Sequence, residues 1–110
     1  MVVDQQSERA IRIIVEKLKK DYKPSKIILF GSYAYGQPDR DSDIDMCIIK
    51  ETRERPIDRR VAVARIVSDP SRLIPFEPLV LSPQEVSERL RAGDQFLQEI
   101  LERGEVLYEA

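Results

Sequence analysis

Asp43 and Asp45 are the residues whose type and spacing most directly suggest chemistry in this chain. The apolar run through Ile49 that follows them predicts a strand, and side chains two residues apart on a strand lie on the same face. Two carboxylates held so close repel each other, so either one keeps a proton or a divalent cation lies between them. Because oxygen ligands favour magnesium or manganese, the pair predicts a metal site.

A second candidate element is the Gly31-Ser32 pair, which follows the apolar run Ile27 to Phe30. Glycine permits tight backbone geometry and the close approach of a ligand, and serine suits the start of a short helix. Backbone N–H groups at such a strand-to-helix turn form an anion site, most naturally for phosphate. A phosphate cradle followed by a carboxylate pair is typical of phosphoryl or nucleotidyl transfer. The alternatives are an ordinary turn and two polar positions on a half-exposed strand.

Gly31-Ser32 followed ten residues later by Asp43-x-Asp45 resembles the signature of the DNA polymerase β-type nucleotidyltransferase superfamily. The resemblance is to its minimal nucleotidyltransferases (MNT proteins), which are often encoded as antitoxins beside HEPN-domain toxins. It covers nearly the whole chain, including an acidic strand before Ser82-Pro83 and the C-terminal segment from Gly104. It implies an α+β nucleotidyltransferase fold, in which helices cover a mixed sheet of three to four strands.

In the relatives, an acidic residue six positions before the Pro of a Ser/Thr-Pro pair completes the metal triad, and Glu77 stands six before Pro83. The resemblance therefore implies that Asp43, Asp45 and Glu77 are catalytic and hold two magnesium ions. It also implies that Gly31 and Ser32 receive the phosphates of ATP, with Glu77 as a candidate general base. A surface glutamate on an edge strand is the alternative for Glu77.

Tyr35 departs from the family pattern, because relatives commonly have arginine at this place. Arg40 or a residue of a partner is the candidate replacement for that positive charge.

The activity implied by the resemblance is the transfer of AMP from ATP to a hydroxyl, such as a tyrosine of a partner HEPN toxin. With 110 residues, we expect no second domain of the kind with which larger members hold their acceptor. One alternative is a binding-only antitoxin whose catalysis has decayed. Another is a nucleotidyltransferase that acts on a small molecule together with a separate subunit.

Composition narrows the function classes. The 110 residues predict one domain, 1–110, for which a lasting partner or a homo- or hetero-oligomer would add stability. A net charge of -2 gives no reason to expect nucleic acid as the main ligand. The absence of histidine excludes histidine-based catalysis, and the single Cys47, expected in the core, excludes an intramolecular disulfide. No leader pattern or bilayer-length apolar run is present, so a cytoplasmic protein without a membrane segment is expected.

The elements that must position these residues follow from periodicity and turn chemistry. A capping box of Ser82 and Glu85 predicts the start of a further helix. An arginine-rich cluster that includes Arg59 and Arg60 is expected on a solvated helix face. The helix after Pro56 is expected to bury Ile57, Val61, Ala64, Ile66 and Val67. We expect helices over 4–20, 32–35, 56–68, 83–90 and 94–103. We expect strands over 26–30, 44–49, 76–81 and 106–108, and the strand over 76–81 is expected to be the third central strand of the sheet.

Overall fold

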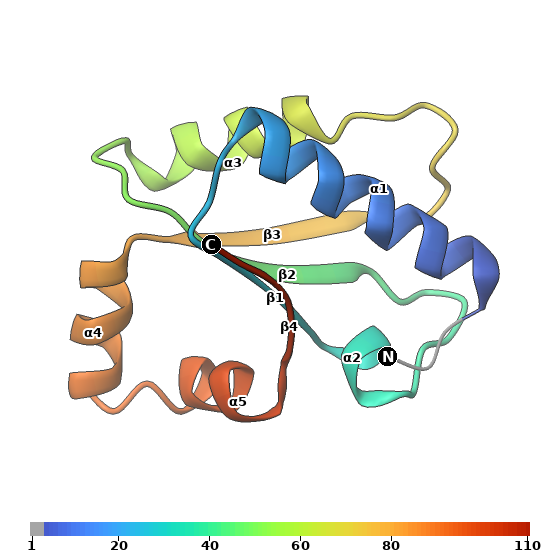
Figure 1. Ribbon diagram of the computed structural model, residues 1–110. Coiled ribbons are helices and arrows are strands. Elements are labelled where there is room, and N and C mark those ends of the chain that lie inside the picture. Colours follow the sequence, from blue (N-terminus) through green and yellow to red (C-terminus); the bar gives the residue numbers. More distant parts are fainter. Residues whose placement is uncertain (1–3) are drawn as a thin grey trace.

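Four strands form one mixed sheet in the computed structural model, which describes residues 4–110 (Figure 1). The strands lie in the order β3-β2-β1-β4. Strand β1 pairs antiparallel with both β2 and β4, whereas β2 and β3 are parallel. Their bounds are Lys26–Phe30 (β1), Ile44–Ile49 (β2), Phe76–Leu81 (β3) and Glu105–Glu109 (β4). The expected α+β fold with a mixed sheet is confirmed.

Strand β3 is an edge strand, so its expected place in the centre of the sheet is wrong. The carbonyl groups of Pro78 and Val80 point away from β2 and accept hydrogen bonds from Arg60 and Arg59, which lie on the helix Pro56–Ile66. The nitrogen of Pro78 lies on the same free side, where no neighbouring strand needs an N–H donor.

Helices cover both faces of the sheet (Figure 1). Helices α1 and α3 lie on one face, α4 and α5 on the other, and the single-turn helix α2 follows the end of β1. Their bounds are Gln5–Asp21 (α1), Ser32–Tyr35 (α2), Pro56–Ile66 (α3), Pro83–Arg91 (α4) and Gln95–Arg103 (α5). Asp4, Ser82 and Asp94 cap the starts of α1, α4 and α5. No helix among residues 4–110 has the length and apolarity needed to cross a membrane.

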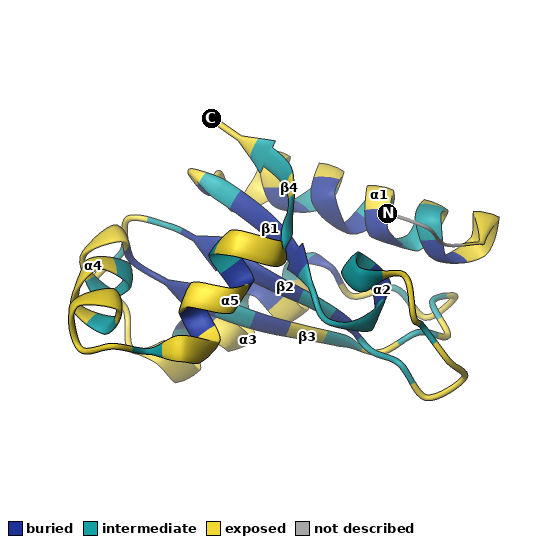
Figure 2. Cartoon of the chain, turned by 90° about the horizontal axis from the view of Figure 1, so that it is seen from below, coloured by how far each residue is buried: buried dark blue, intermediate teal, exposed yellow. Residues whose placement is uncertain are grey.

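Alternation along β2 separates two hydrophobic cores. Ile44, Met46 and Ile48 point into the core beneath α1 and α3, whereas Cys47 and Ile49 belong to the core with α5. Figure 2 shows the buried middle of the sheet between the helices. Because side chains alternate, Asp45 lies on the α5 face of the sheet, next to buried Cys47.

Helix α3 buries a different face from the one expected from its sequence. Ile57 is 59% exposed and Val61 is 42% exposed, while Arg59, Val63 and Val67 are buried. Ala64 is also exposed, and Ile66 is only partly buried. The expected apolar stripe is therefore wrong at Ile57, Val61 and Ala64 and confirmed at Val67, because an arginine occupies a buried position near the start of the helix.

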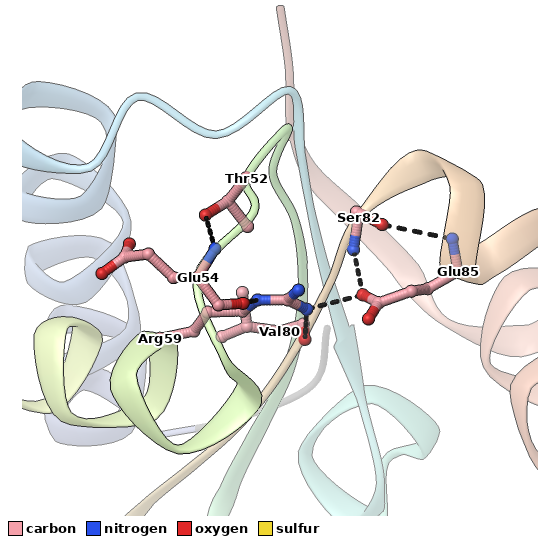
Figure 3. Close-up of polar contacts among 6 residues, drawn as sticks. All are labelled: Thr52, Glu54, Arg59, Val80, Ser82 and Glu85. Carbon is pink, nitrogen blue, oxygen red and sulfur yellow. Dashed lines mark hydrogen bonds and ion pairs between the residues drawn. The ribbon is translucent and has the colours of Figure 1, made fainter.

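Arg59 is accommodated by three acceptors, which Figure 3 shows around its guanidinium. Its Nε donates to the carbonyl of Glu54 at 2.8 Å, and its Nη1 donates to the carbonyl of Val80 and to Glu85 Oε1, the latter at 2.5 Å. The same Glu85 oxygen accepts from the N–H of Ser82 in the capping box. Arg59 thus joins α3, β3 and the start of α4, and its expected place on a solvated helix face is wrong.

Candidate functional site

The turn after β1 lies directly against a carboxylate. Gly31 caps α2 with φ 76°, and a Cβ added there would lie 2.3 Å from Asp45 Oδ2. Only glycine leaves room for this approach, and the positive φ favours glycine as well. The glycine carbonyl accepts from the N–H groups of Ala34 and Tyr35, which closes the turn of α2. The glycine turn and the Asp-x-Asp segment, separate in sequence, are therefore in contact.

Ser42 holds the loop between α2 and β2 in place. Its Oγ accepts from Ser32 Oγ at 2.9 Å and from the N–H of Asp39 at 2.8 Å. The local hydrogen bonding expected of Ser42 is confirmed, and it ties the loop that carries Asp43 to the start of α2.

Asp45 lies between two neighbours on the sheet. It pairs in register with Phe30 on β1 and with Glu77 on β3, so the two carboxylates share one face. Burial above all, together with the negative charges of Asp43 and Glu77, raises the pKa of Asp45 to about 6. The structure therefore brings the three predicted carboxylates near enough to repel, which is the electrostatic setting that a cation relieves.

Glu77 is engaged by an arginine. Arg60 Nη2 lies 2.7 Å from Glu77 Oε2, and Arg60 Nη1 donates to the carbonyl of Pro78 at 3.3 Å. Within residues 4–110, no group of three or more Asp, Glu or Cys side chains is arranged to hold a metal ion as it stands. The oxygen donors of Asp43 and Asp45 fit a divalent cation, and Glu77 adjoins them as a third donor that is paired with Arg60.

Arg103 supplies a cation beside Tyr35. Its guanidinium carbon lies 4.3 Å from the centre of the Tyr35 ring, so α5 places a positive charge against α2. On the same side, the ring of Phe96 meets the ring of Phe30 edge-to-face, with centroids 5.8 Å apart. Sequence reasoning named Arg40 as the candidate cation and missed Arg103, because nothing local links the end of α5 to α2.

Arg60 was also missed as a neighbour of the site. The sequence showed it only as one member of an arginine-rich cluster, and the partner it meets lies on another element. A basic residue on the crossover helix before an acidic strand is too common a pattern to identify such a contact.

A glycine turn against an Asp-x-Asp strand, with a third carboxylate on the adjacent parallel strand, defines this domain as a nucleotidyltransferase by class. Residues 12–110 match the sequence model of the family described as "Polymerase beta, Nucleotidyltransferase". The chain belongs to this family.

Two known proteins are similar to this chain, one in sequence and one in structure. The chain is 33% identical over 106 residues to a Methanocaldococcus jannaschii protein named "Putative protein adenylyltransferase MJ0604", covering 92% of this chain and 97% of that protein. The crystal structure of a "putative nucleotidyltransferase" from Sulfolobus solfataricus matches with a TM-score of 0.55 at 23% identity, covering 79% of this chain and 82% of that one. The structural match shows a shared fold.

Proposed function

We propose that this nucleotidyltransferase is a magnesium-dependent protein adenylyltransferase that transfers AMP from ATP to a hydroxyl of a partner protein. The observation that supports this most is the contact of Gly31 with Asp45, which places a turn able to receive phosphate against the carboxylates. The name of the M. jannaschii relative points to the same reaction on a protein acceptor.

The turn and the carboxylates have different roles in the proposed reaction. The turn at Gly31 and Ser32 receives the triphosphate of ATP, because its backbone can be approached closely and its N–H groups suit an anion. Asp43, Asp45 and Glu77 would hold magnesium, two ions in the complete site. Bound there, magnesium neutralises the triphosphate and lowers the pKa of the acceptor hydroxyl.

The transfer itself is a displacement at the α-phosphorus. The acceptor oxygen bonds to that phosphorus, the bond to the oxygen bridging to the β-phosphate breaks, and pyrophosphate leaves. Glu77 is the candidate acceptor of the hydroxyl proton, because its side chain is 47% exposed and can be reached from solvent. Positioning and charge neutralisation provide most of the rate in reactions of this type.

The acceptor in this proposal is a side-chain hydroxyl, such as a tyrosine, of a HEPN-domain toxin. The resemblance to MNT antitoxins supports this choice, and AMP on the toxin would silence it. This chain would then act as the antitoxin of the pair.

A binding-only antitoxin is the second candidate, and the ion pair of Glu77 with Arg60 favours it. If Glu77 never leaves Arg60, the third metal ligand is missing, and the chain would neutralise a toxin by forming a complex. Titration with magnesium and ATP separates the two candidates, because only a competent site binds both.

The proposed reaction is tested by incubating the protein with a HEPN toxin, ATP and magnesium, and measuring the toxin's mass. We expect the addition of AMP to a tyrosine, lost in Asp43→Asn and retained in Asp41→Asn, a matched change at an exposed loop position. If the toxin gains no mass while Asp43→Asn neutralises it as well as the unaltered protein, the binding-only function is correct.

A further inference from the structure

The ion pair between Arg60 and Glu77 crosses the free edge of the sheet. Arg60 belongs to α3, which covers one face, whereas Glu77 shares the opposite face with its register partner Asp45. The guanidinium reaches around β3 and contacts both the Glu77 carboxylate at 2.7 Å and the Pro78 carbonyl at 3.3 Å. It therefore holds Glu77 from the side opposite the aspartates.

The two neighbouring arginines of α3 differ in how firmly they are held. The Arg59 side chain is 6% exposed and has three acceptors, so its position is fixed by the fold. The side chains of Arg60 and Glu77 are 51% and 47% exposed, and ion pairs in water contribute little to stability. Glu77 can therefore leave Arg60 at little cost.

Space for that exchange exists beside the pair. Arg60 lines a groove of about 530 Å³ along the outer edge of β3, between α3 and α4, together with Ile57, Pro78 and Leu79. A guanidinium released from Glu77 can remain in this groove and keep its contact with the Pro78 carbonyl.

We infer that Arg60 is a positioning residue that withholds Glu77 from Asp43 and Asp45 until a divalent cation binds. This inference rests on the proposed function, because it assumes a cation at the aspartate pair. In the free protein Glu77 is paired with Arg60, and in the metal-bound protein the carboxylate exchanges its partner for the cation. Arg60 thereby competes with the cation for one carboxylate and lowers the metal affinity of the site.

The test is a Mn²⁺ titration of the full chain by calorimetry, comparing the unaltered protein with Arg60→Gln. We expect Arg60→Gln to bind Mn²⁺ about three- to tenfold more tightly, because a solvent-screened competitor is removed. Arg60→Lys, which keeps the charge, should restore most of the weaker affinity. Arg55→Gln, at the arginine that precedes α3 and pairs with Asp58, should leave the affinity unchanged.

A double-mutant cycle separates competition for Glu77 from a general charge effect. In a Glu77→Gln background, Arg60→Gln should no longer change Mn²⁺ affinity. The inference is overturned if Arg60→Gln binds Mn²⁺ equally or more weakly, or if its effect persists without Glu77. Failure of the proposed function looks different, because Asp45→Asn would then bind Mn²⁺ as well as the unaltered protein does.

Discussion

At Gly31 the backbone and a carboxylate come closer than any side chain would allow. This one contact joins the part of the site suited to phosphate with the part suited to a cation. The sequence predicted a ligand-binding turn at Gly31. It did not predict the tight fit of this turn against Asp45, because the fit depends on how β1 and β2 pair.

Replacing Gly31 by alanine should therefore damage both stability and the site. The added Cβ meets Asp45 Oδ2 and the backbone keeps an unfavourable φ, so we expect a loss of about 2–3 kcal/mol in urea unfolding. Gly36→Ala is the matched control, since φ is 79° there and nothing lies within 4 Å of an added Cβ. Its cost should be about 1 kcal/mol, with Mn²⁺ binding retained. Equal costs at the two glycines would contradict the close contact.

The ionised carboxylate of Asp45 lowers the stability of the metal-free protein. Its pKa is raised from 3.8 to about 6, so the folded state holds a proton that the unfolded state releases over that interval. Ionised Asp45 therefore destabilises the fold above about pH 6, and the penalty disappears as the pH falls towards about 4. Asp45→Asn should stabilise the metal-free protein at pH 7 by about 1–2 kcal/mol, a value reduced for solvent screening.

The measurement is thermal or urea unfolding of both proteins across this pH range. The advantage of Asp45→Asn should shrink to nothing near about pH 4, where the carboxyl is protonated in both states. Added Mn²⁺ should stabilise the unaltered protein only. A pH-independent advantage would show that the gain has another cause.

Among the elements, α3 shows where sequence patterning fails. The helix begins at Pro56 as predicted, but the expected apolar stripe faces solvent at Ile57 and Val61. Patterning assumes that an arginine faces water, whereas Arg59 donates to the carbonyls of Glu54 and Val80 and to the Glu85 carboxylate. Val80 and Glu85 lie more than twenty residues further along the chain, so no local signal could reveal the burial of Arg59.

Removing Arg59 should loosen the junction of α3, β3 and α4. Arg59→Gln removes the buried guanidinium that donates to the carbonyls of Glu54 and Val80 and pairs with the Glu85 carboxylate, so we expect a loss of about 3–5 kcal/mol in urea unfolding. Arg55→Gln, whose side chain is 79% exposed, should change stability by less than about 0.5 kcal/mol. Similar effects of the two substitutions would contradict a structural role for the buried guanidinium.

For the whole molecule, the sequence predicted the helices and strands and their order along the chain. The Gly31-Ser32 and Asp43-x-Asp45 segments indicated the family, and strand alternation placed Asp45 on one face. The edge position of β3 was named only as the alternative for Glu77, and the pairing of Glu77 with Arg60 and the stacking of Arg103 on Tyr35 were not predicted. Each of these depends on contacts between segments far apart in the chain.

The chemistry of this molecule is tested most directly by following label from ATP to a HEPN toxin. We predict that the toxin acquires label from [α-³²P]ATP, that label from [γ-³²P]ATP leaves in pyrophosphate, and that Asp45→Asn abolishes the transfer. Label on the toxin from the γ-phosphate, or undiminished transfer by Asp45→Asn, would contradict AMP transfer by the carboxylates beside Gly31.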